Sequence, residues 1–88
     1  MEVGDAVQFP MGTDVIIIGE VEAMENGAVY VREAHAFHHL WGGSNGARGE
    51  LHEITRPELI EPASKKNARI VKESLTKWRK KTWRTSYE

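Results

Sequence analysis

Basic side chains near the C-terminal end have the strongest capacity for binding a charged partner. Nine of the twelve lysines and arginines lie within residues 65–84, although the formal net charge of the whole chain is only −1. Clustered Lys and Arg side chains bind phosphates, and tryptophan rings stack on nucleic-acid bases. The candidate contact residues for nucleic acid or a protein partner are Lys65, Lys66, Arg69, Lys72, Lys77, Trp78, Arg79, Lys80, Lys81, Trp83 and Arg84.

The two parts of the chain carry opposite charge. Nine basic and two acidic residues give residues 65–88 a formal charge of +7, whereas three basic and eleven acidic residues give residues 1–64 a charge of −8. A solvated charged face is the simplest interpretation. Pairing of the basic tail with the acidic part of a neighbouring copy, or of a larger complex, is the second. Contact with nucleic acid is the third, but the acidic part repels phosphates, so we rank assembly above it.

Four histidines raise the question of a metal site. His35, His38 and His39 would share one face of a helix, but on a strand only His35 and His39 would, and His52 follows later. Zinc sites need three or four convergent ligands at defined spacing, and this spacing matches no such motif. We therefore predict neither a metal nor a cofactor.

A glycine-rich segment, GGSNGARG at residues 42–49, suggests an anion or small-ligand loop. A phosphate-binding loop needs a lysine and a hydroxyl residue after its last glycine, and both are missing here. Arg48 could still clamp an anion against a flat aromatic wall, which makes a small-ligand-binding or inhibitor protein a further alternative. The candidate loop residues are Tyr30, Trp41, Gly43, Asn45, Gly46 and Arg48.

Catalysis has little support in the sequence. Glu50 and Glu53 flank His52 and could form an acid–base group, but neither a nucleophile motif nor an oxyanion motif accompanies them. The chain has no cysteine, so thiolate chemistry and disulfides are excluded. We predict that the protein is not an enzyme.

Short strands must position these residues in the first two-thirds of the chain. Alternating or continuous apolar patterns predict strands in residues 3–9, 15–24, 28–34 and 50–55, while 35–41 fits either strand or helix. Asn26-Gly27 predicts a type I′ hairpin turn, and Gly19 a bend or bulge. Prolines confine residues 56–62 to an edge strand or a tight turn. Four or five such strands predict a mainly β fold, a small closed or nearly closed antiparallel barrel.

A helix follows the strands. Ala68, Val71, Leu75 and Trp78 recur at spacings of three, four and three, which predicts an amphipathic helix whose apolar stripe docks on the barrel. Ser64 is the expected N-cap. The predicted organisation is a barrel over residues 1–62 and a basic amphipathic helix and tail over residues 63–88.

The segment VIIIGEVEAMENGAVYVREA, residues 15–34, resembles the central hairpin of Sm-like and related SH3-like small barrels. The matching positions are Gly19, Val21, Val29, Val31 and Ala34. The resemblance implies a barrel that can form rings through its edge strands. The Arg-Gly signature of the family's fourth strand and its N-terminal helix are absent, so its RNA pocket is not transferred. In its compactness and tail chemistry the chain is also similar to small accessory proteins of bacteria and phages.

The chain start is acidic, and the longest apolar run covers only residues 15–18. Signal peptides need a basic start and a longer apolar run, and a membrane span needs about 20 apolar residues. We therefore expect a cytoplasmic protein without a membrane span. The leading hypothesis is a non-enzymatic protein that self-associates as an assembly module.

Overall fold

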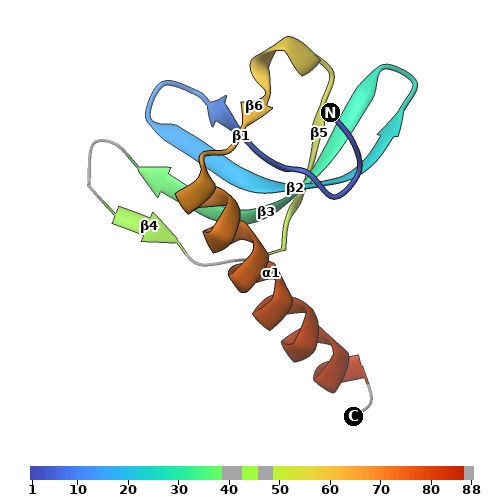
Figure 1. Cartoon of the computed structure of the whole chain (residues 1–88), viewed down its shortest axis with the longest axis vertical. Helices are drawn as coiled ribbons and strands as arrows, with labels where there is room; N and C mark the ends of the chain where they lie inside the picture. Colours follow the sequence, from blue (N-terminus) through green and yellow to red (C-terminus); the bar gives the residue numbers. More distant parts are fainter. Residues whose placement is uncertain (39–42, 46–48, 87–88) are drawn as a thin grey trace.

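A bent antiparallel sheet carries the C-terminal helix across one of its faces (Figure 1). The computed structural model describes residues 1–38, 43–45 and 49–86. The elements are β1 (Ala6–Met11), β2 (Val15–Glu25), β3 (Ala28–His38), β4 (Gly43–Asn45), β5 (Leu51–Ile54), the 3₁₀ turn η1 (Pro57–Leu59), β6 (Glu61–Pro62) and α1 (Lys65–Ser86). The predicted class, mainly β with a C-terminal helix, is confirmed.

The sheet is open, so the predicted barrel is only loosely a barrel. The strand order is β4-β3-β2-β1-β6, and β5 pairs with the edge of β3 that β4 also uses. After β5 the chain turns through η1 and meets β1 only at the two residues of β6. The segment with prolines at both ends was predicted as an edge strand or a tight turn, and it forms both.

Gly19 is the point at which the sheet bends, as predicted. The β2–β3 register shifts between Ile18 and Gly19, and a Cβ at Gly19 would overlap the carbonyl oxygen of Arg32. The adjacent Ile17 and Ile18 are only 2% and 0% exposed, so β2 is buried on both faces here. The close approach of the two strands at this bulge therefore requires glycine.

The central hairpin also follows the prediction. Asn26 and Gly27 have φ values of 51° and 79°, the two positive angles that a type I′ turn needs. The returning strand β3 continues to His38, so residues 35–38 of the ambiguous segment are strand. Residues 39–41 lie outside the described part of the chain.

Two apolar clusters occupy the two faces of the sheet. The larger consists of Val7, Phe9, Ile17, Val21, Val29, Val31, Ala36, Ile54 and Ile60. The smaller lies under the helix and consists of Ile18, Ala34, Val71 and Leu75, with Ala6, Phe37, Ile70 and Trp78 packed against it. Helix α1 is thus part of the core, because its side chains complete the second cluster.

The start of α1 is capped as predicted. The backbone N–H of Asn67 donates to Ser64 Oγ at 3.2 Å, and the N–H of Ala68 donates to the Ser64 carbonyl at 2.7 Å. Val71 and Leu75 of the predicted stripe are 1% and 0% exposed. No helix among the described residues is long and apolar enough to cross a membrane.

Candidate functional site

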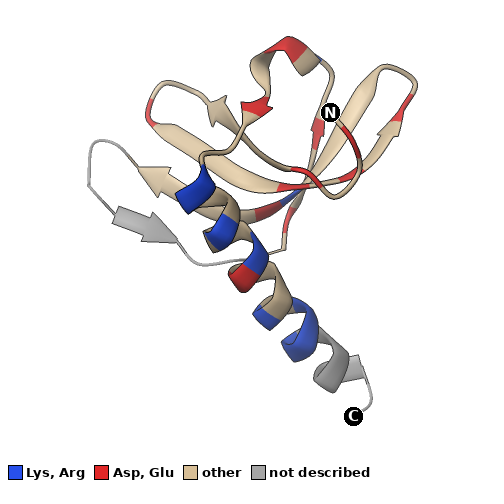
Figure 2. Ribbon diagram, viewed as in Figure 1, with Lys and Arg blue, Asp and Glu red and all other residues tan. Residues whose placement is uncertain are grey.

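Basic residues recur along helix α1, whereas acidic residues are spread over the sheet and its loops (Figure 2). The apolar stripe of α1 packs on the sheet, and most of the basic residues between the stripe positions lie on the exposed side of the helix. Within residues 65–81 the only acidic side chain is Glu73. We call the outward cations the cationic face; its members are all exposed and are Lys65, Lys66, Arg69, Lys72, Lys77, Lys80 and Lys81.

A shallow groove runs along the cationic face. Arg69, Lys72, Lys77 and Lys80 line it, together with Glu73 and Thr76. The hydroxyl of Thr76 donates to the carbonyl of Lys72 at 2.7 Å, one turn earlier in the helix. The groove is therefore built by one continuous helix, which fixes the spacing of its charges.

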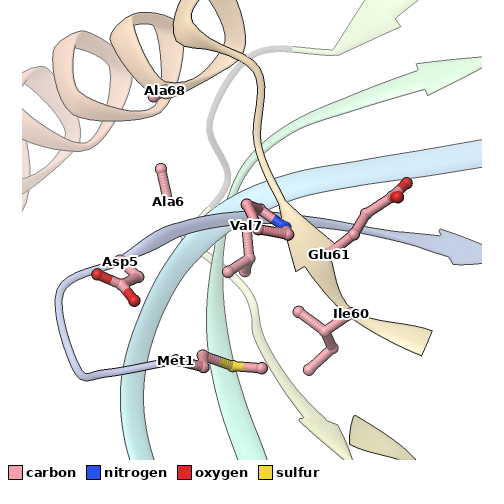
Figure 3. Close-up of a pocket in the computed structure, with 8 residues that line it drawn as sticks. Met1, Asp5, Ala6, Val7, Ile60, Glu61 and Ala68 are labelled. Atoms are coloured by element: carbon pink, nitrogen blue, oxygen red, sulfur yellow. The ribbon is translucent and has the colours of Figure 1, made fainter. Parts of the chain in front are cut away.

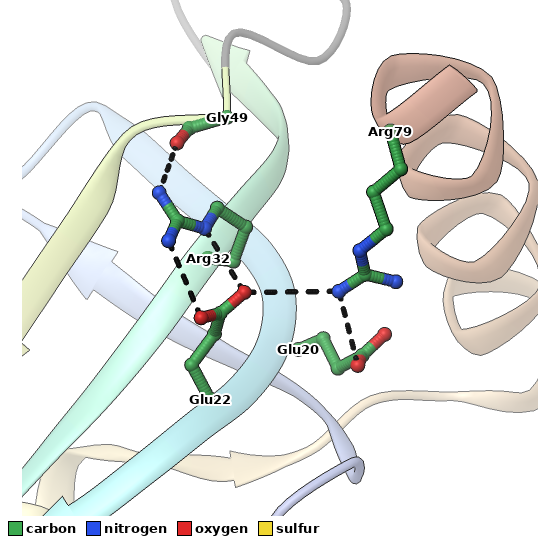
Figure 4. Close-up of polar contacts among 5 residues, drawn as sticks. All are labelled: Glu20, Glu22, Arg32, Gly49 and Arg79. Atoms are coloured by element: carbon green, nitrogen blue, oxygen red, sulfur yellow. Dashed lines mark hydrogen bonds and ion pairs between the residues drawn. The ribbon is translucent and has the colours of Figure 1, made fainter. Parts of the chain in front are cut away.

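Arg79 differs from the cations of this face because it turns toward the sheet (Figure 4). Its Nη2 lies 3.3 Å from Glu20 Oε1 and 3.7 Å from Glu22 Oε1, both on β2. Arg79 was predicted to contact a partner; in the structure it joins the basic helix to the acidic sheet of its own chain.

Glu22 is shared between two arginines. Arg32 donates to it through Nε at 3.1 Å and Nη2 at 3.2 Å, in a bidentate arrangement. The hydrogen bonds from Arg32, and the charges of Arg32 and Arg79, hold the pKa of Glu22 below its ordinary value of 4.5, although partial burial acts in the opposite direction. Glu22 therefore stays ionised and keeps the helix attached at ordinary pH.

Trp78 contributes to the junction between helix and sheet. The Arg32 guanidinium lies 5.3 Å from the centroid of the Trp78 ring, and a Cβ at Gly49 would overlap the indole. The sequence predicted this tryptophan as a stacking surface for bases. Packing makes the indole partly buried, and its remaining surface opens into a small hollow between Lys77 and Lys81.

Several predicted residues lie outside the described part of the chain. These are Trp41, Gly46 and Arg48, and the side chains of Trp83 and Arg84. Gly43 and Asn45 belong to β4, where they pair with His38 and Ala36. The ligand loop therefore stays a prediction.

Tyr30 was predicted as a wall of that loop, and it lies on β3 opposite Glu53 of β5. The charge of the Glu53 carboxylate raises the pKa of the Tyr30 phenol.

His35 and His38, the two described histidines that are close in sequence, do not converge. His35 stacks on Phe37, with ring centroids 5.3 Å apart, and its buried Nδ1 has no hydrogen-bond partner among the described residues. His38 lies three residues further along a regular stretch of β3 and faces the other side of the sheet. His39 is outside the described residues.

His52 instead contacts Glu33, which the sequence analysis did not predict as a site residue. Its Nε2 lies 2.8 Å from Oε1 of Glu33, a carboxylate that is only 4% exposed. The pairing of β5 with β3 creates this contact, and no local sequence pattern predicts that these two strands pair. The predicted acid–base group of Glu50, His52 and Glu53 is thereby divided, because Glu53 faces Tyr30.

A cavity of about 520 Å³ lies between the N-terminal segment, β1, β6 and the start of α1 (Figure 3). Its apolar wall carries two carboxylates, those of Asp5 and Glu61. The lining residues are Met1, Asp5, Ala6, Val7, Ile60, Glu61, Pro62 and Ala68. Sequence reasoning did not predict it, because it arises where segments about 55 residues apart meet at the β1–β6 pair.

No family model, no curated protein and no solved structure matches this chain. These comparisons neither support nor contradict the resemblance of the central hairpin to Sm-like barrels. The function is therefore argued from the geometry described above.

Proposed function

We propose that the protein binds nucleic acid through the cationic face of α1. The observation that carries this proposal is the way the helix is docked: its apolar stripe and Arg79 contact the sheet of the same chain, and the residues of the cationic face are exposed. The sequence alone favoured assembly, with the basic tail pairing to the acidic part of a neighbour. Docking of the helix on its own sheet weakens the reason for that ranking.

Two acidic side chains of β2 beside the helix are already partnered. Glu22 pairs with Arg32 and Arg79, and Glu20 pairs with Arg79. Their charge is locally compensated, and it repels a phosphate backbone on the far side of the helix less than the formal −8 suggests. Screening over about 8–10 Å at physiological ionic strength reduces the effect of the more distant carboxylates further.

The length of the cationic face fits several consecutive phosphates. Residues 65–81 of a helix that rises 1.5 Å per residue span about 24 Å. Successive phosphates of one strand rise by about 3.4 Å along the axis of duplex DNA, so a face lying parallel to that axis extends over roughly seven of them. Lysines and arginines on a helix surface without a base-reading element favour contact with phosphates rather than with a particular sequence.

Fluorescence anisotropy with labelled single- and double-stranded oligonucleotides tests the proposal. Four to six phosphate contacts predict that log K falls against log salt with a slope of about −3 to −5. Replacing Arg69, Lys72 and Lys80 together by Gln should reduce that slope by about 2 to 3. Arg56→Gln is the matched control, because Arg56 is exposed and lies beyond β5 beside Glu58. Absence of binding at low salt, or equal loss in the control, would overturn the proposal.

Assembly remains the second candidate, and the cavity beside β6 is the observation that favours it. An apolar cavity with two carboxylates, Asp5 and Glu61, suits a segment rich in aromatic and basic residues. The C-terminal sequence TWRTSYE, residues 82–88, of a second copy has that chemistry. Both functions are non-enzymatic, and they differ in whether the protein forms a salt-sensitive oligomer without nucleic acid.

A further inference from the structure

The side chain of Glu33 is buried, with only 4% of the residue exposed. Among the residues whose burial the structure describes, no other acidic or basic residue is buried. Burying a carboxylate costs several kcal/mol unless a partner compensates its charge. Among the described residues, the side-chain partner of Glu33 is His52, whose Nε2 lies 2.8 Å from Oε1 of the carboxylate. A small domain thus holds a carboxylate in its interior beside a single imidazole.

A second carboxylate lies beside this pair. Glu33, Glu50 and His52 each offer one ligand atom, and these atoms all lie within 4.8 Å of one another. The backbone holds them in place, because the N–H of Glu33 donates to the carbonyl of Glu50 at 2.8 Å. The His52 ring is further fixed by an edge contact with Phe9, with centroids 5.6 Å apart.

These side chains open into a cavity of about 300 Å³ near the end of β3. His38 lines the same cavity, so two imidazoles and two carboxylates are gathered there. The rest of its wall is apolar and consists of Met11, Val15, Ile17 and Ala36. A mixed group of nitrogen and oxygen donors in an otherwise apolar hollow is the environment that a transition-metal ion uses.

We propose that Glu33, Glu50 and His52 bind a divalent transition-metal ion, with Zn²⁺ as the best match, and that His38 or water completes the coordination. Two carboxylates balance the charge of the ion, which resolves the cost of burying Glu33. Donors about 2.0–2.2 Å from a tetrahedral Zn²⁺ lie about 3.3 Å from one another. The His52–Glu33 pair, now 2.8 Å apart, therefore widens slightly on binding, and Glu50 moves to complete the group. Exposed Glu50 has the freedom to make that movement. Ca²⁺ fits poorly, because it takes six to eight oxygen ligands.

The ion would act as a clamp between β3 and β5. Among the described strands, β5 pairs only with β3, over four residues. Ligands from both strands, Glu33 on β3 and His52 on β5 with Glu50 just before it, would cross-link them. This inference is independent of nucleic-acid binding, since the cationic face shares no residue with it.

Isothermal titration of the chelator-treated full chain with Zn²⁺, followed by visible absorption of the Co²⁺ form, tests the site. We expect one ion per chain and a Co²⁺ spectrum of a low-coordinate site with nitrogen and oxygen ligands. Glu50→Gln removes one ligand and leaves the buried Glu33–His52 pair in place, so it should weaken Zn²⁺ binding at least tenfold.

Glu53→Gln is the matched control, with the same charge change three residues further along the chain but a side chain that faces Tyr30. It should bind Zn²⁺ as the unmodified chain does. If the unmodified chain binds no Zn²⁺, or if Glu50→Gln binds it with unchanged affinity, the assignment is wrong. Equal weakening in both variants would also overturn it, because it would show a general charge effect.

Discussion

The guanidinium of Arg32 lies 5.3 Å from the centre of the Trp78 ring and thereby joins the third strand of the sheet to the helix. The same guanidinium donates to both oxygens of Glu22 and, at 2.7 Å, to the carbonyl of Gly49. One side chain therefore holds β2, β3, the start of β5 and α1 together (Figure 4). The cationic face keeps its orientation because this junction fixes the helix.

Replacing Arg32 by Lys should destabilise the fold although it conserves the charge. Lysine cannot donate in a planar fork to Glu22 and at the same time reach Gly49, and it stacks less well on an indole. We expect the free energy of unfolding to fall by about 1–2 kcal/mol. Urea unfolding monitored by tryptophan fluorescence measures it. Arg56→Lys, at the exposed pair with Glu58, should change stability by less than about 0.5 kcal/mol, and a similar loss in both variants would contradict the role assigned to Arg32.

A pair of glycine substitutions separates backbone strain from packing at the same junction. Gly49 and Gly12 have nearly the same φ, 68° and 73°, but a Cβ at Gly49 meets Trp78 whereas one at Gly12 meets nothing within 4 Å. Gly12→Ala should cost about 1–2 kcal/mol for the left-handed conformation alone. Gly49→Ala should cost a further 1–3 kcal/mol, roughly, for the displaced indole. Equal thermal or urea stabilities of the two variants would show that Trp78 does not pack on Gly49.

Acid should loosen the attachment of the helix through Glu22. Its pKa is lowered in the folded protein, so its contribution to stability is present above its ordinary value of 4.5 and is lost as the pH falls through the folded value. Glu22→Gln should therefore lower stability at neutral pH and have little effect at the acid end of the titration. Urea midpoints of both chains between neutral and acid pH test this. Curves that stay parallel throughout would contradict it.

Local signals in the sequence predicted most of the elements. The alternation around Val7 and Phe9, the Asn26-Gly27 turn and the Ser64 cap each depend on a few neighbouring residues, and the structure shows all three. Such features can be predicted because the alternation of side chains along a strand, and the residue preferences of turns and caps, depend only on residues a few positions apart.

The candidate sites depend on pairings that no local signal specifies. Glu33 meets His52 nineteen residues away, and Arg79 meets Glu20 fifty-nine residues away. The bulge at Gly19 also alters the alternation of β3, so the inward position of Glu33 does not follow from the apolar pattern. The sequence also could not predict whether the sheet closes into a barrel, because closure depends on which strands the short β5 and β6 pair with.

Truncation of the chain can distinguish assembly from nucleic-acid binding, but only if the truncated protein still folds. A chain ending at Pro62 loses Val71 and Leu75, which are 1% and 0% exposed, and uncovers Ile18 and Ala34 on the sheet. Losing two such side chains costs about 2–5 kcal/mol each, an amount comparable with the whole stability of a small domain. We expect this chain to lose its cooperative unfolding transition, so its oligomeric state carries no information about partners.

A chain ending at Lys81 keeps the docked stripe, Arg79 and the cationic face, and it removes only residues 82–88. If a second copy inserts that segment beside Asp5 and Glu61, light scattering after size exclusion should show an oligomer for the full chain at low salt and a monomer for the truncated one. The pair of substitutions Asp5→Asn and Glu61→Gln should dissociate the full chain in the same way. If both chains are monomers and both bind oligonucleotides with the same salt dependence, assembly through the tail is contradicted and the cationic face remains as the binding surface.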